Sequence, residues 1–379
     1  ISAGKINFEK LISTPKMMTK LGKLGKILGP KRMMPNPKLG TITNDIIKAV
    51  KDVKSGQVEI KNDKDGNVGL SIGKKSFSDE DLIKNFNSVI DTLKKEKPIG
   101  LKGIIISQSN TTINCKNDGC IKIFMGHGTG DKKYGGSPTP LETYDYHFIS
   151  GEKHLQKLND LGIDIPEEKQ VKIGYPKFDS YVNNQINKEE HMNHLGIKDR
   201  TRKNILYAPT WKWGNGTLQK YFYKFCRELT NEFNLIIRPH FFERKYIPLL
   251  KTWTKLNRIK HVYFSNPSNI LKNTTINDFA ISDILISDTS SILYEYLITL
   301  KPIIIAESNS ADLHNMPDNM NINNLAKKFN GHNSNILKLV YESIEKREQK
   351  NDYKTMLNNC FYFNDGSSTD RAIEFISSL

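Results

Sequence analysis

Short apolar runs alternate with amphipathic stretches along most of this chain. From residue 120 onward the runs have the length of buried strands, at 121–125, 144–150, 171–176, 204–211, 234–240, 261–264, 284–287 and 303–305. Stretches with helical spacing of apolar positions lie between them, at 152–161, 221–233 and after 291. Strands that alternate with helices predict an α/β fold with parallel sheets. The polar stretch 179–202 predicts an interdomain connection that contains a helix.

The first part of the chain has a different pattern. Residues 21–38 are rich in Gly and Pro, which predicts a stiff, non-helical connector. Helices are predicted at 45–54 and 79–95, and a hairpin joins strands 57–61 and 68–72 through Asp65-Gly66. A strand at 103–107 closes this part, which predicts a partial α+β segment.

The stretch 278–307 organises the second part. Its strand 284–287 runs into Asp288, Thr289, Ser290 and Ser291, and a helix follows. Hydroxyls at a helix N-terminus favour a bound anion. The same pattern also fits an ordinary capped helix in an α/β sheet.

Other polar residues follow the ends of predicted strands. Arg238 and His240 come after one strand, and His127 lies in a Gly126-His127-Gly128 turn after another. Ligands of parallel sheets bind beyond the carboxyl ends of the strands, so we expect these residues at one site. A histidine between glycines is open to a ligand and could act as a general base, although it also fits a structural loop.

Composition adds three constraints. The 379 residues carry a net charge of +15, of which +10 falls in residues 1–110, so that part is the candidate for a polyanion partner. A solvated, lysine-rich surface would look the same. The four cysteines form no C-x-x-C pair, which favours a reducing compartment and predicts no zinc site. We see no membrane-spanning run and no signal peptide, and the first residue is Ile, so we expect a fragment.

Three strings in residues 1 to about 109 carry a resemblance. They are GKLGKILGPKRMMPNPKLGTIT from Gly22, IGKKSF from Ile72 and KPIGLKG from Lys97. This segment closely resembles the later part of the large-subunit ribosomal protein L1. The resemblance implies contact with ribosomal RNA, for which Lys31, Arg32 and Lys38 are the candidates. The family's Met-Gly-Pro segment after its closing strand is absent here.

Seven further strings lie in the same order as in a second family. They are HGTGDK at His127, YDYHFISGE at Tyr144, IGYPKFD at Ile173, NILYAPTW at Asn204, IIRPH at Ile236, SDILISDTSSILYEY at Ser282 and NDGSSTDRA at Asn364. Together they resemble the CDP-glycerol glycerophosphotransferases of teichoic acid synthesis, over about 119–379. Gly130-Asp131 stands where many members have Pro-Leu, and the strands that precede the HGT loop in that family are missing.

This second resemblance implies a fold, a reaction and roles for particular residues. The fold is a GT-B-like pair of Rossmann-like domains, with the site in the cleft between them. The reaction moves glycerol phosphate from CDP-glycerol to a hydroxyl of a glycan or polyol-phosphate acceptor, without a cofactor or a metal. His127 would be the base, and His240 could compete for that role. Arg238, His240, Ser290 and Ser291, with the rest of the 288–291 turn, would hold the diphosphate.

We therefore expect three segments: an L1-like fragment at 1–110, a truncated first GT-B domain at 119–202, and a nucleotide-binding domain at 203–379. We expect a cytoplasmic location, and a peripheral position on the inner face of the cell membrane is the alternative. Two alternatives remain open. One is an rRNA-binding protein with an inert second half, and the other is a GT-B enzyme that uses a different sugar nucleotide.

Overall fold

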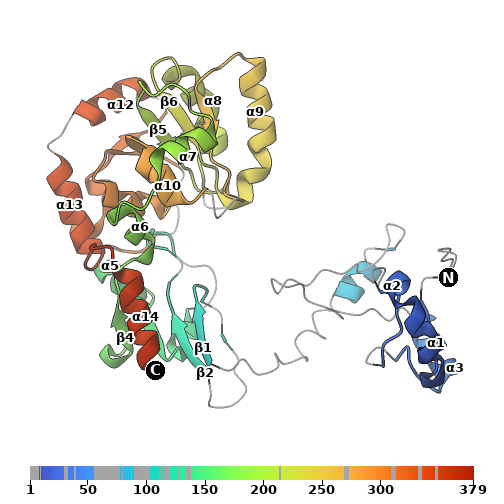
Figure 1. Ribbon diagram of the computed structural model, residues 1–379. Helices are drawn as coiled ribbons and strands as arrows, with labels where there is room; N and C mark the ends of the chain where they lie inside the picture. The colour runs from blue at the N-terminus through green and yellow to red at the C-terminus, as the bar shows by residue number, and fades with distance from the viewer. Residues whose placement is uncertain are drawn as a thin grey trace. The chain divides into compact units, whose positions relative to one another are not determined.

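The structure is a computed structural model that divides into two compact units, Ile1–Lys97 and Pro98–Leu379, which are described separately (Figure 1). The description covers residues 8, 10–29, 33–37, 40–54, 77–78, 80–86, 88, 103–110, 112–113, 120–126, 128–133, 138–212, 215–268, 273–308, 313–331, 335–345 and 349–379.

Short helices make up most of the regular structure described in the first unit, where Ser13 and Ile42 also form an isolated parallel bridge. Short helical segments follow one another as η1 (Pro15–Met17), α1 (Met18–Leu21), η2 (Gly22–Leu24) and α2 (Gly25–Leu28). The prediction of a non-helical connector was therefore wrong for residues 22–28. Gly22 and Gly25 adopt right-handed helical angles, and the Leu28 side chain is fully buried. The helix predicted at 45–54 is confirmed as α3 (Ile46–Lys54), and residues 80–86 of the second are helical. The predicted hairpin lies outside the described residues.

The second unit begins with a four-stranded parallel sheet in the order β1-β2-β3-β4. Its strands are β1 (Gly103–Ser107), β2 (Cys120–Phe124), β3 (Tyr146–Ile149) and β4 (Gln170–Lys172). We expected the first segment of the chain to end at residue 110, whereas the first compact unit ends at Lys97. Residues 98–110 belong to the second unit, because β1 pairs with β2 over its whole length, from Gly103 opposite Cys120 to Ser107 opposite Phe124.

A second parallel sheet has six strands in the order β10-β9-β8-β5-β6-β7. They are β5 (Asn204–Tyr207), β6 (Asn234–Ile237), β7 (Val262–Phe264), β8 (Ile284–Ser287), β9 (Ile303–Ala306) and β10 (Lys327–Phe329). The central strands β5, β6, β8 and β9 are buried at every residue, as expected for a sheet covered on both faces. The strands predicted here are confirmed, and β10 was not predicted.

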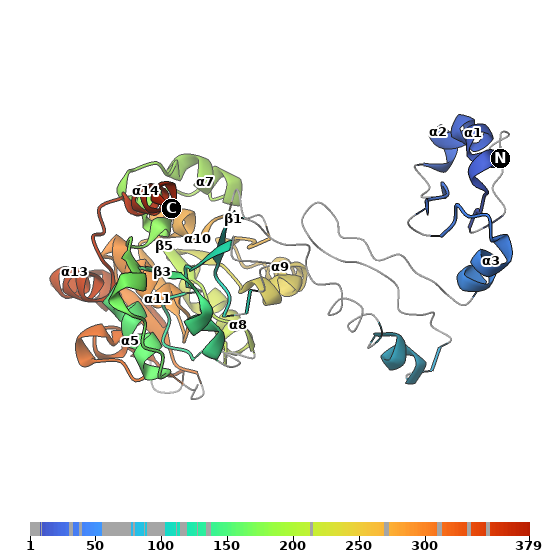
Figure 2. The same ribbon diagram turned by 90° about the horizontal axis from the view of Figure 1, so that it is seen from below.

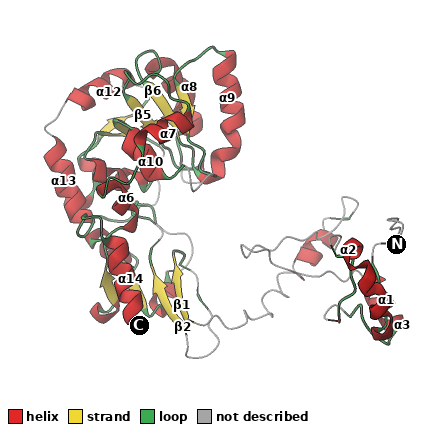
Figure 3. Ribbon diagram, in the orientation of Figure 1, coloured by secondary structure: helices red, strands yellow, loops and turns green. Residues whose placement is uncertain are grey.

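Helices cover both faces of the second sheet (Figure 3). On one face, α8 (Leu218–Leu229), α9 (Ile247–Leu256) and α12 (Ile336–Glu345) pack a core around Phe222 and Phe225. On the other, α10 (Thr275–Ile281), α11 (Ile292–Glu295), η9 (Tyr296–Thr299) and α13 (Gln349–Cys360) pack around Phe279 and Tyr296. The predicted connection 179–202 contains α6 (Asp179–Val182) and α7 (Lys188–Leu195). The shorter helical segments are η4 (Thr139–Thr143), η5 (Glu167–Lys169), η6 (Pro176–Phe178), η8 (Phe241–Tyr246), η10 (Asp318–Met320) and η11 (Ile322–Asn324).

The chain's last helix returns to the first sheet. In α14 (Ser368–Ser378), Phe375 packs edge-on against Tyr146 and Phe148 of β3, and α14 lies beside β4 in Figure 1. The expected division at residue 203 therefore does not hold for α14, because its apolar face completes the core of the first sheet.

A close backbone approach fixes this crossing. Figure 2 shows α13 beside α5 (Glu152–Asp160), whose first residue follows Gly151. A Cβ atom on Gly151 would collide with the Cys360 carbonyl oxygen at the end of α13. Glycine at this position therefore lets the end of α13 reach the first sheet.

Candidate functional site

A cavity of about 610 Å³ opens where the carboxyl ends of strands from both sheets of the second unit meet. Loops after β2, β3 and β4 form one wall, and loops after β5, β6 and β8 form the other. The lining residues are Gln108, Met125, Gly126, Gly128, Gly130, Lys132, Phe148, Ser150, Lys157, Ile173, Gly174, Tyr175, Pro176, Lys177, Thr210, His240, Thr275, Thr289, Ser290, Ser291, Ile292 and Glu295. Parallel sheets bind ligands at this end, so the geometry is that of a binding site.

Two motifs that are far apart in the sequence meet in this cavity. A Cβ atom built on Gly130 would lie 2.9 Å from the Cα and from the backbone nitrogen of Ser291, and one on Gly128 would lie 3.4 Å from the Ser291 Cβ. The glycine-rich loop after β2 therefore packs directly against the turn after β8. Any larger side chain at Gly130 would separate the two motifs.

The turn after β8 exposes three of its four polar residues to the cavity, Thr289, Ser290 and Ser291. The Ser291 hydroxyl donates to Glu295 Oε1 at 3.2 Å, and Ser290 Oγ accepts from the Ile292 N–H at 3.4 Å. The helix that follows is short, because α11 spans only Ile292–Glu295 before the chain tightens into η9. An anion at this turn would therefore be bound mainly by the hydroxyl groups, and less by the dipole of so short a helix.

Asp288 differs from its three neighbours. Its side chain is fully buried, and its carboxylate accepts from the Thr210 N–H, the Thr217 N–H and the Thr217 hydroxyl, each at 2.9 Å. Burial raises the pKa of Asp288 to about 6, although these hydrogen bonds oppose the shift. The carboxylate ties the turn to the loop after β5 and is not part of the cavity lining, so a direct contact with diphosphate does not fit it.

His240 lies on the cavity wall. Its ring stacks on Trp211, with centroids 5.8 Å apart, and its Nδ1 accepts from the Phe242 N–H at 3.3 Å. That hydrogen bond places the proton of the neutral ring on Nε2. The imidazole can therefore donate a hydrogen bond toward a ligand.

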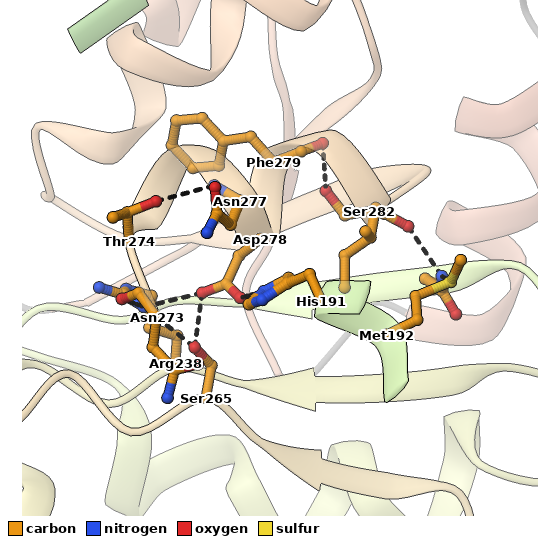
Figure 4. Close-up of polar contacts among 12 residues, drawn as sticks. His191, Met192, Arg238, Ser265, Asn273, Thr274, Asn277, Asp278, Phe279 and Ser282 are labelled. Carbon is orange, nitrogen blue, oxygen red and sulfur yellow. Dashed lines mark hydrogen bonds and ion pairs between the residues drawn. The ribbon is translucent and has the colours of Figure 1, made fainter. Parts of the chain in front are cut away.

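Arg238 is not part of the cavity lining. Its Nη1 donates to Asp278 Oδ2 at 2.8 Å, to Ser265 Oγ at 3.0 Å and to the Asn273 carbonyl at 3.0 Å (Figure 4). His191 Nε2 contacts the other carboxylate oxygen of the fully buried Asp278 at 2.7 Å. These contacts make Arg238 part of a buried network that holds α7, α10 and the end of β6 together, a role that the sequence does not reveal.

Four predicted residues lie outside the described part of the chain. They are the candidate base His127 and the candidate RNA contacts Lys31, Arg32 and Lys38. Both sequence neighbours of His127, Gly126 and Gly128, line the cavity.

The structure also adds residues that were not predicted. Lys177 of the IGYPKFD string forms an ion pair with Glu295, and Tyr175 donates to the same carboxylate at 3.2 Å. Lys157 of α5 and Ser150 after β3 complete this wall. Ser150 and Lys177 follow the ends of strands, so their positions in the sequence could have predicted them. Lys157 lies on the apolar face of a helix, and no other feature of the sequence marks it. Among the described residues, no three His, Cys, Asp or Glu side chains gather to hold a metal ion.

The fold and the cavity define the class of protein: paired parallel α/β domains of the GT-B type, with the candidate site between the two sheets. Residues 125–378 match the family described as CDP-Glycerol:Poly(glycerophosphate) glycerophosphotransferase, and the chain belongs to this family. The structure is similar to that of the Wall Teichoic Acid Polymerase TagF, with a TM-score of 0.53 and 17% identity, over 73% of this chain and 72% of that chain. A TagF variant soaked with CDPG gives a TM-score of 0.52 and 18% identity, over 73% and 71% of the two chains.

The first segment matches a different family. Residues 1–112 match the Ribosomal protein L1p/L10e family. Large ribosomal subunit protein uL1 of Pelagibacter ubique (strain HTCC1062) is 58% identical over 127 residues, which cover 33% of this chain and 55% of that protein. The same protein of Rickettsia africae (strain ESF-5) is 56% identical over 103 residues, which cover 27% and 43%. The chain thus spans about half the length of the curated relatives it matches. Both predicted resemblances, to ribosomal protein L1 and to the CDP-glycerol glycerophosphotransferases, are confirmed.

Within the described ranges, no helix combines the length and the apolar character that a bilayer crossing requires.

Proposed function

We propose that the second unit transfers glycerol phosphate from CDP-glycerol to a hydroxyl of a glycan or polyol-phosphate acceptor. The observation that carries this proposal is the cavity in which Gly128 and Gly130 pack on Ser291 of the turn after β8. Both motifs lie within the region that matches the glycerophosphotransferase family. The cavity has hydroxyls and lysines for a diphosphate, and its volume suits a nucleotide-sized ligand.

The chemistry assigns separate tasks to the two walls. The acceptor oxygen forms a bond to the phosphorus that carries glycerol, and the bond from this phosphorus to the bridging oxygen breaks, so CMP leaves. His127 would take the proton of the acceptor hydroxyl. The Ser290 and Ser291 hydroxyls, with His240, would stabilise the charge that develops on the leaving phosphate. Arg238 would act indirectly, because its network fixes the end of the strand that presents His240.

The donor site is tested by the double variant Ser290→Ala, Ser291→Ala. Each lost hydrogen bond should weaken CDP-glycerol binding by about 0.5–1.5 kcal/mol, or somewhat more for a charged partner. Isothermal titration calorimetry measures this affinity. The matched control is Ser378→Ala at the exposed end of α14, which should bind as the wild type does. Wild-type affinity in a folded double variant would contradict the site.

The base is tested by CMP release in the presence of an acceptor. Loss of a general base should lower turnover by roughly 10²- to 10⁴-fold, with donor affinity nearly unchanged. We expect this result for His127→Ala, whereas His240→Ala should weaken donor binding. The opposite pattern would transfer the role of base to His240.

The match to uL1 favours a second candidate function, in which residues 1–110 bind ribosomal RNA. Replacing Lys31, Arg32 and Lys38 by Ala should weaken binding of an rRNA fragment and reduce its salt dependence, because each phosphate contact releases counterions. A filter-binding titration at several salt concentrations measures both effects. A peripheral position on the inner face of the cell membrane stays a prediction, which cell fractionation can check.

A further inference from the structure

Helix α5 carries two buried lysines on the side that faces the cavity. Lys153 and Lys157 are one helical turn apart, and only 1% and 3% of their surfaces are exposed. Ammonium groups are rarely buried to this extent, because their hydration is costly to lose. Two such groups on one face of a short helix therefore call for a physical explanation.

Lys153 has a partner within the protein. Its ammonium forms an ion pair with Asp131 of the glycine-rich loop and lies 3.7 Å from the centre of the Tyr294 ring. The Tyr294 hydroxyl donates to the second Asp131 oxygen at 2.6 Å. This lysine thus joins the loop after β2 to α11 of the second sheet.

Lys157 has a different position. Its Nζ donates to the carbonyl oxygen of Gly128 at 3.1 Å, and its side chain is part of the cavity wall. Gly128 packs on Ser291, so the ammonium lies on the loop that meets the proposed phosphate-binding turn.

The groups around Lys157 set its charge. Burial lowers the pKa of Lys157 to about 7, the charge of Lys153 lowers it further, and Asp131 opposes the shift. His154 on the same helix is neutral, since burial lowers its pKa to about 3. Among the described residues, His314 is also within electrostatic range of Lys157, and Cys360 lines a smaller cavity together with Lys157.

We propose that Lys157 is a donor-binding residue whose ammonium contacts the diphosphate of the nucleotide donor from the side of the first sheet, opposite Ser290 and Ser291. This inference rests on the proposed function. The ammonium lies in the cavity wall, on the loop that packs against Ser291, so one diphosphate in the cavity would contact it and the two hydroxyls together. The two walls of the cavity would then share one ligand.

The proposal has a consequence for pH. Only the ammonium form attracts the diphosphate, so a bound donor raises the pKa of Lys157 and takes up a proton. The pKa of Lys157 in the free protein is about 7. Donor affinity should therefore be constant below this pH and should fall by up to about tenfold per pH unit above it. The two phosphates of CDP-glycerol keep their charge over this range, so the slope reports on the protein.

The experiment measures dissociation constants by calorimetry between pH 6.5 and 9 for the full chain and three variants. Lys157→Met should bind CDP-glycerol roughly ten- to a hundredfold more weakly, with a flat pH profile. Lys157→Arg should bind tightly with a flat profile, because a guanidinium stays charged. The control Lys255→Met, at an exposed position of α9, should keep the wild-type affinity and slope.

The outcomes separate this proposal from the donor assignment. Wild-type binding of CDP-glycerol with the same profile in Lys157→Met would overturn the role of Lys157 alone. Binding of UDP-glucose in place of CDP-glycerol, with the Lys157-dependent slope, would overturn the donor and support the residue. Binding of neither ligand by the wild type would overturn both. If Lys157→Met fails to fold, Lys157→Arg decides the question. A Lys157→Arg protein whose donor affinity changes with pH as the wild type's does would contradict the proposal.

Discussion

The contact between Gly130 and Ser291 allows a sharp test of how the site is assembled. In Gly130→Ala the new methyl group would lie 2.9 Å from the Cα of Ser291, whereas carbon atoms prefer a separation of about 3.5–4.0 Å. The loop and the turn must therefore move apart by about 0.6–1.1 Å. Both neighbouring atoms belong to the backbone, so no side-chain rotation can relieve the overlap.

The expected magnitude follows from this overlap. Overpacking of this kind costs about 1–3 kcal/mol of the free energy of unfolding, and each kcal/mol lowers the melting temperature by about 2–4 °C. A displacement near 1 Å in a site can also lower turnover by about 10²-fold. Differential scanning fluorimetry measures the first effect, and CMP release from CDP-glycerol measures the second.

Gly128→Ala is the matched control for this experiment. Its methyl group would lie 3.4 Å from the Ser291 Cβ, an ordinary contact, and the same substitution is made two residues away in the same loop. We expect its melting temperature to stay within about 2 °C of the wild type. Equal melting temperatures and equal turnover for the two variants would refute the packing of the loop on the turn.

Three further predictions concern stability. Arg238→Met leaves the Asp278 carboxylate buried without its cation and should lower the free energy of unfolding by about 3–5 kcal/mol in urea titrations; an unchanged midpoint would contradict the buried network. Burial lowers the pKa of His154 to about 3, so the free energy of unfolding should fall as pH drops from about 6.5 toward 3, by up to ~1.4 kcal/mol per pH unit. This decrease should be less steep in His154→Leu. Removal of residues 1–97 should leave the melting temperature of the second unit unchanged, whereas removal of 1–110 should lower it, because β1 is lost from β2.

Local pattern was enough to predict most of the elements that build the site. The strand β8, for example, follows from Ile284, Leu285 and Ile286, because a strand buried on both faces needs an unbroken apolar run. The order of the motifs then identified the family, and the positions after strand ends pointed to His240, Ser290 and Ser291. These features are readable because each depends on residues that are neighbours in the sequence.

Some local signals pointed to the wrong structure. The glycines of 22–28 predicted a connector, yet this stretch is helical around the buried Leu28, because packing outweighs the weak helix propensity of glycine. The small polar turn at 288–291 predicted four residues around the diphosphate, yet the Asp288 carboxylate accepts a backbone hydrogen bond from Thr210 and does not line the cavity.

By itself, the sequence determined the α/β class, the two joined families and the strand-end residues, since these follow from local periodicity and motif order. Only the tertiary structure decided which partners those residues meet. It assigned 103–107 to the sheet of the second unit, returned α14 to that sheet, and paired Arg238 with Asp278. It also brought Lys157 of a helix into the wall of the cavity. These contacts join residues that are distant in the chain, and their free energies depend on burial and charge that only the folded arrangement creates.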